Sequence, residues 1–165
     1  MVGRDFLFAV LIGVCLFLSD FVTGWLTSIS AGIPVIFIMA IIIGIIAGTV
    51  TNGLFATALT WIISIPLGIL IAPVVLPEYI GPDADLFVLA IFVPLWALRG
   101  TFNYQSEGNF LETIIAGLGY LVIIIFIGPV IYVVSVTFGI LGGVIGKLLR
   151  NVLKREIKNQ TSVYN

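Results

Sequence analysis

The residue with the clearest chemical potential in this sequence is an acid inside an apolar stretch. Asp20 falls within the run that covers residues 5–28, with Ser19 and Thr23 close beside it. An ionised carboxylate at the centre of a bilayer costs about 3 kcal/mol or more unless it is paired or close to the headgroups. Asp20 is therefore a candidate proton or cation site. The structural alternative is an acid at the outer headgroup boundary, or a neutral carboxyl held in a hydrogen bond.

Three hydroxyl residues form a second candidate group. Thr57, Thr60 and Ser64 stand at positions i, i+3 and i+7 of another apolar run, so on a helix their hydroxyls share one face. Such a face can line a polar path for an ion or a small substrate. The alternative is structural, because each hydroxyl can donate to its own backbone or make an interhelical bond worth about 0.6–2 kcal/mol.

Catalytic signatures are absent from the chain. The sequence contains no histidine, and Cys15 is its single cysteine, which excludes histidine-based catalysis, bis-histidine haem ligation and an intramolecular disulfide. Asp83 and Asp85 form a near pair of acids, but no third acid accompanies them as a metal ligand. We therefore expect no enzymatic activity, no metal or cofactor and no nucleic acid partner. An intramembrane enzyme is the least favoured alternative.

Small residues recur at helical spacing in two apolar runs. The stripes consist of Ala40, Gly44 and Gly48 in the first run, and of Gly139, Gly143 and Gly146 in the second. A smooth stripe of this kind lets another backbone approach closely and gain dispersion contacts that lipid would not provide. We expect the two stripes to pack inside the protein, with packing against a partner subunit as the alternative.

The composition places these residues in a membrane. The 165 residues are 61% hydrophobic and 9% charged, with a mean hydropathy of +1.28. We predict an all-α, multi-pass transmembrane bundle of about six short spans. Turn residues and polar loops divide the chain into helices near 5–28, 33–50, 54–76, 86–98, 111–127 and 130–148.

The last two predicted spans depend on one dipeptide. Gly128-Pro129 interrupts a block that is long for one upright helix and short for two. A shift of 95 positions aligns residues 24–48 with 119–143, matching Pro34 with Pro129, which predicts an internal repeat and a turn at Gly128-Pro129. The alternative is shared membrane composition without duplication. A helix that is only kinked there would leave four or five spans.

Charge asymmetry predicts the orientation. Five basic residues lie near the C-terminus, whereas Glu78, Asp83 and Asp85 lie in a loop without lysine or arginine. The basic residues are Lys147, Arg150, Lys154, Arg155 and Lys158. By the positive-inside rule we expect a single membrane domain over 1–149 in the cell membrane, a basic cytoplasmic tail over 150–165, and both termini in the cytoplasm.

Two functions are compatible with these features. We expect a small, non-catalytic integral membrane protein that acts through helix packing. Its partners would be the lipid bilayer and either further copies of itself, as a homo-oligomer, or a larger membrane complex in which it is an accessory subunit. The alternative is a small transporter or channel in which Asp20 is linked to proton or cation movement, since a repeat around a midplane site is a common transporter plan.

Overall fold

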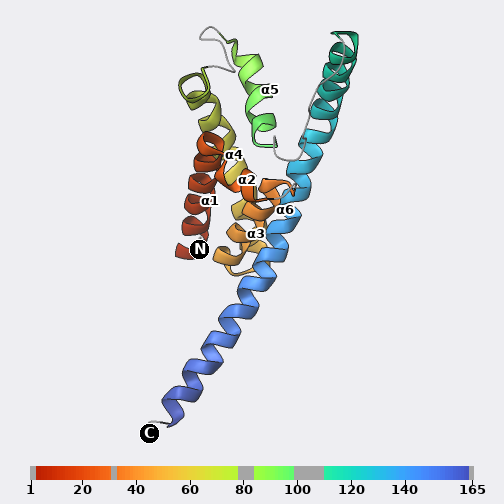
Figure 1. Ribbon diagram of the computed structural model, residues 1–165. Coiled ribbons are helices and arrows are strands. Elements are labelled where there is room, and N and C mark those ends of the chain that lie inside the picture. Colours follow the sequence, from red (N-terminus) through yellow and green to blue (C-terminus); the bar gives the residue numbers. More distant parts are fainter. Residues whose placement is uncertain (1–2, 31–32, 78–83, 99–109, 164–165) are drawn as a thin grey trace.

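The computed structural model is a helical bundle (Figure 1). It describes residues 3–30, 33–77, 84–98 and 110–163, and only the backbone for 110–125 and 158–163. The described residues form six helices: α1 (Arg4–Thr23), α2 (Trp25–Ile29), α3 (Val35–Ala47), α4 (Val50–Val75), α5 (Leu86–Trp96) and α6 (Phe110–Val163). Helices α3 and α4 pack on each other, α1 packs on the two of them, α6 packs on both, and α5 packs mainly on α4.

Glycine and proline set the first helix boundaries. Gly24 has a φ of 67°, a left-handed conformation that ends α1 and starts the short helix α2. The predicted helix over 5–28 is therefore two helices with a corner between them. Pro34 stands immediately before α3, and Gly48, with a φ of 70°, ends it. Thr49 then caps α4 by accepting a hydrogen bond from the Asn52 backbone N–H at 3.2 Å.

Three helices among the described residues are long and apolar enough to cross a membrane. They are Arg4–Thr23, Val50–Val75 and the segment Phe126–Ile157 of α6. Helices α3, with 13 residues, and α5, with 11, are apolar but shorter than the roughly 20 residues that a full crossing requires. The all-helical class is confirmed for the described residues, whereas the predicted six short spans are not.

The block after residue 110 is the main departure from the predicted topology. In place of two passes over 111–127 and 130–148, α6 is one helix that continues through Pro129. A proline inside a helix removes one backbone hydrogen bond. A turn at the same place would leave about four N–H and four C=O groups without helical partners, which hydrocarbon strongly disfavours. The continuous helix is therefore the less costly solution.

The predicted internal repeat has no counterpart in the helices. Residues 24–48 contain α2, a connection and α3, whereas residues 119–143 lie entirely within α6. Pro34 precedes a helix, whereas Pro129 stands inside one. The matched positions share membrane composition, and their backbones differ.

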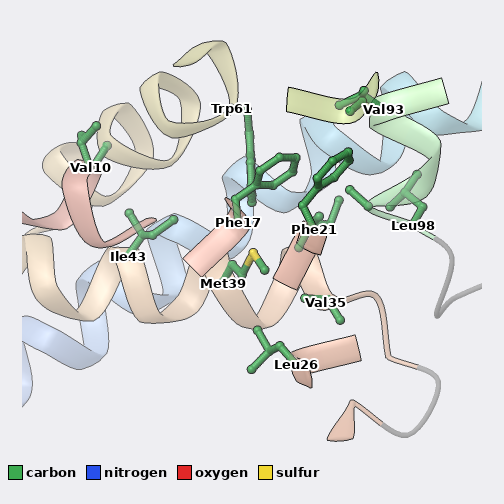
Figure 2. Close-up of a cluster of buried hydrophobic side chains, with 14 of the residues drawn as sticks. Val10, Phe17, Phe21, Leu26, Val35, Met39, Ile43, Trp61, Val93 and Leu98 are labelled. Atoms are coloured by element: carbon green, nitrogen blue, oxygen red, sulfur yellow. The ribbon is translucent and has the colours of Figure 1, made fainter. Parts of the chain in front are cut away.

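Aromatic side chains form the centre of the bundle (Figure 2). Phe17 and Phe21 of α1 stack with ring centroids 6.0 Å apart, and Trp61 of α4 meets Phe17 edge to face, also at 6.0 Å. Met39 and Ile43 of α3 are buried in the same cluster. Edge-to-face and offset-stacked rings add about 0.5–1.5 kcal/mol per pair to the energy of burial. This cluster joins the first, third and fourth helices.

Glycines bring α3, α4 and α6 into backbone contact. A Cβ placed on Gly44 of α3 would collide with the carbonyl oxygen of Gly139 and with the backbone at Gly142 and Gly143. A Cβ on Gly53 of α4 would collide with the same Gly139 oxygen. Three helix backbones therefore converge where any side chain would hold them apart.

The end of the bundle nearest the N-terminus is fastened by Arg150. Its guanidinium donates to the Asp5 carboxylate of α1 at 2.6 Å and to the Ile46 carbonyl in the last turn of α3 at 2.7 Å. A cation on the final carbonyls of a helix also complements the helix dipole. The exposed ion pair itself contributes little. Its main effect is to hold the start of α1 and the end of α3 beside the same turn of α6.

The convergence of three backbones gives a matched test on a single helix. Gly139→Ala should lower the free energy of unfolding by about 1–3 kcal/mol, because the added methyl would collide with Thr57 and with the Gly53 carbonyl of α4. Gly128→Ala is the control, since a Cβ there meets no described atom within 4 Å and alanine favours the helix by about 1 kcal/mol. Reversible unfolding in mixed micelles measures both. Equal stability of the two variants would contradict the described packing.

Candidate functional site

Asp20 is buried and serves as a hydrogen-bond acceptor for the helix that follows it. Its side chain is 2% exposed, and Oδ1 accepts from the backbone N–H groups of Leu26 and Thr27, both at 2.8 Å. The Thr27 hydroxyl donates to Oδ2 at 2.7 Å. The first turn of a helix has four N–H groups without helical partners. Asp20 satisfies two of them in α2 from across the Gly24 corner.

This arrangement gives the carboxylate a structural task. Two backbone N–H groups and one hydroxyl of α2 donate to it, so the carboxylate holds the start of α2 against the end of α1. Ser19 and Thr23 direct their hydroxyls to carbonyl oxygens of their own helix, at 2.9 Å from the Leu16 oxygen and 2.7 Å from the Ser19 oxygen. Ser19 Oγ also accepts from the Trp25 indole N–H at 3.2 Å, so both hydroxyls have local hydrogen-bond partners at the corner between α1 and α2.

Two of the three hydroxyls on α4 have backbone partners in their own helix. Thr57 donates to the Gly53 carbonyl and Thr60 to the Ala56 carbonyl, each at 2.8 Å. Both side chains are fully buried. A Cβ on Gly139 would collide with Thr57 Oγ1, so this hydroxyl fills the contact between α4 and α6. These bonds correspond to the structural alternative for this face.

Ser64 differs from its two neighbours on the face. It is 0% exposed, and its Oγ has no hydrogen-bond partner among the described residues. A buried hydroxyl left unpaired costs about 1–3 kcal/mol. It is the polar atom on this face whose position local hydrogen bonding does not explain.

A chain of polar contacts links α4, α6 and α5, and sequence reasoning missed it. The Trp61 indole N–H donates to Ser135 Oγ at 2.9 Å, and Ser135 in turn donates to the Tyr132 carbonyl at 2.6 Å. The Tyr132 hydroxyl donates to the Pro94 carbonyl near the end of α5 at 3.0 Å. The available signal was the depth of Trp61 in its run, because a buried indole N–H usually finds an acceptor.

An apolar cavity of about 610 Å³ lies between α4, α5 and α6. Its size is within the range of about 300–1,000 Å³ that is typical of ligand pockets. Pro94, Pro129 and Tyr132 line it together with aliphatic and aromatic side chains. Neither Asp20 nor the hydroxyls of Thr57, Thr60 and Ser64 contribute to the lining. The cavity and the candidate ion-binding residues are therefore separate.

The predicted packing residues gather where α3 and α4 meet α6. A Cβ on Gly143 would collide with the Thr49 carbonyl, and one on Gly146 with the Ile45 carbonyl. Ala40 is fully buried, and Gly48 lies directly beneath the Arg150 guanidinium. Both stripes face other helices of the same chain.

Acidic side chains do not gather into a metal site within the part of the chain that the structure describes. That part holds no group of three or more histidine, cysteine, aspartate or glutamate residues close enough to share an ion. Asp85 is exposed and stands immediately before α5. Glu78 and Asp83 lie outside the described residues.

The capping geometry of Asp20 predicts graded effects on stability. Asp20→Ala should lower the free energy of unfolding by about 1–3 kcal/mol, because it leaves the buried Leu26 and Thr27 N–H groups unpaired. Asp20→Asn should cost clearly less, since its amide oxygen can still accept both N–H groups. Thr27→Val, which removes only the hydroxyl, serves as the control. If Asp20→Ala has the same free energy of unfolding in micelles as the wild type, the capping role is contradicted.

Comparison with models of known protein families, with curated protein sequences and with solved structures finds no match to this chain. Its function must therefore be inferred from its own residues and contacts.

Proposed function

We propose that this chain is a small, non-catalytic integral membrane protein that acts through helix packing. It would serve either as an accessory subunit of a larger membrane complex or as a bundle that associates with copies of itself. The observation that carries the proposal is the convergence of α3, α4 and α6 at Gly44, Gly53 and Gly139, where no side chain fits between the backbones. Such a junction suits a scaffold, because backbones in direct contact hold the three helices in one arrangement.

The state of the polar side chains supports the same function. Asp20 accepts the N–H groups that start α2, and Thr57 and Thr60 donate within α4. Conduction of an ion requires oxygens that can exchange partners with it. Here Asp20, Thr57 and Thr60 are bonded within the fold, and Ser64 is the exception.

Assembly with a partner would use the outer faces of the bundle. The glycine stripes are covered within the chain, so they are not available to a second protein. Large apolar side chains are exposed on the outside, among them Leu7 and Leu11 of α1 and Phe87 of α5. In a bilayer these faces contact either lipid tails or another helix.

The transporter alternative rests on one specific observation. Ser64 Oγ is buried without a hydrogen-bond partner among the described residues, on the same helix face as Thr57 and Thr60. A substrate or ion that bound there would supply the missing partner. If this alternative holds, Ser64→Ala should abolish transport. If the scaffold function holds, Ser64→Ala should be neutral or stabilising, because an unpaired buried hydroxyl is removed.

We also propose that both termini face the cytoplasm. Asp5 and Arg150 meet at one end of the bundle, and the basic residues of the α6 end follow Arg150. On a Cys15→Ser background, a single cysteine at Asn151 should resist a membrane-impermeant maleimide in intact cells and react after permeabilisation. A cysteine at Asp85 should show the reverse pattern. Labelling of the Asn151 cysteine in intact cells would overturn this orientation.

Flux and assembly measurements separate the two functions. Wild-type protein in liposomes should move neither protons, Na⁺ nor small neutral solutes, and Asp20→Asn should make no difference. If the bundle associates with itself, copies labelled with donor and acceptor dyes should show energy transfer that persists on dilution with lipid. If it is an accessory subunit, the same energy transfer should occur between a labelled copy and its labelled partner membrane protein. Flux that is lost in Ser64→Ala or Asp20→Asn would replace the scaffold function with transport.

A further inference from the structure

The C-terminal part of α6 continues past the end of the bundle. Arg150 marks that end, because it contacts both the first turn of α1 at Asp5 and the last turn of α3 at Ile46. Thirteen further residues remain in the helix, up to Val163, which corresponds to about 20 Å. Figure 1 shows α6 crossing the bundle obliquely, so that this extension leans beneath the other helices.

One face of the extension is on the side of α6 that meets α1 and α3. Arg150, Leu153, Lys154 and Ile157 stand at i, i+3, i+4 and i+7 and therefore share one stripe of the helix. Arg150 fixes the direction of that stripe, because its guanidinium reaches α1 and α3. Leu153 and Ile157, which follow on the same stripe, are 56% and 63% exposed.

The charges near this stripe are mostly positive. Lys154 lies on it, and Lys147 stands one turn before it on the same side of the helix, whereas Arg155 lies more than about 100° away from the Arg150 direction. Glu156 is the one acid among the described residues of the extension and lies about 100° or more around the helix from the Arg150 direction. Apolar side chains beside lysine and arginine on a helix that leaves a membrane span are typical of segments that lie against anionic lipid.

We propose that the extension of α6 beyond Arg150 docks on the anionic lipid of the leaflet at this end of the bundle. Leu153 and Ile157 enter the boundary between headgroups and acyl chains, and Lys154 meets the lipid phosphates. The occupant is lipid because the stripe forms the last two turns of the candidate span Phe126–Ile157, and because its charge is complementary to phosphate. This inference requires only that α1, α4 and α6 span the membrane, so it holds for a scaffold and for a transporter alike.

A fluorescent label at Leu153 tests the docking in the full chain. Cys15→Ser/Leu153→Cys carries an environment-sensitive dye, and the protein is reconstituted in bilayers of neutral phosphatidylcholine or of phosphatidylcholine with anionic phosphatidylglycerol. Acrylamide, a neutral water-soluble quencher, should quench the dye several-fold less in the anionic bilayer, and high salt should reverse the difference. The same dye at Asn151, which lies off the stripe and is exposed, should be quenched equally in both bilayers.

Charge variants distinguish lipid from a protein occupant. Lys154→Gln should lower the ratio of docked to free extension by about fivefold, the contribution of one basic residue near an anionic leaflet. Arg155→Gln and Glu156→Gln, which change charge away from the stripe, are the controls and should change the ratio less. Equal shielding of the Leu153 dye in both lipids, lost on dilution of the protein, would assign the face to a second copy and overturn the proposal. Full quenching in both lipids would overturn it as well.

Discussion

Every helix end in or near hydrocarbon needs partners for its backbone N–H and C=O groups, and this requirement underlies much of the structure. Water can satisfy such groups at the surface of a soluble protein, whereas here side chains must do so. Asp20 satisfies the start of α2, and Thr49 the start of α4. The Arg150 guanidinium donates to a carbonyl in the last turn of α3, and the Tyr132 hydroxyl donates to a carbonyl near the end of α5. Several of the most conspicuous polar residues therefore serve the backbone.

The glycine junction works together with these caps. Without a hydrophobic driving force between helices in lipid, close packing has to provide the attraction, and it does so only where backbones can approach. Gly44, Gly53 and Gly139 permit that approach between three helices at once. The Thr57 hydroxyl fits into the same contact because it is turned back onto the Gly53 carbonyl. Packing and backbone satisfaction thus depend on one another at a single point of the bundle.

Local patterns in the sequence predict the helical class, a helix near residues 33–50 and the small-residue stripes. The predicted turn before residue 54 is wrong, because α4 begins at Val50, directly after the Gly48 and Thr49 caps. Local patterns fail where the structure depends on the relative energies of two backbone arrangements, or on contacts that only the folded chain brings together. At Gly128-Pro129 the sequence resembles a turn, yet one missing hydrogen bond costs less than two new helix ends in hydrocarbon. Asp20 resembles an ion site from its position alone, and only the left-handed corner at Gly24 brings the α2 N–H groups to it. The Trp61–Ser135 bond joins residues 74 positions apart, which no local pattern can predict.

The long-range contacts of Arg150 have a consequence for how the protein is made. Its two partners, Asp5 and Ile46, precede it by 145 and 104 positions. Chains emerge from the ribosome N-terminus first, at about 5–20 residues per second. The start of α1 and the end of α3 are thus synthesised many seconds before the residue that fastens them exists. During that interval α6 does not yet cover Gly44 and the neighbouring face of α3. Other membrane helices can therefore pack against this smooth face until translation is nearly complete.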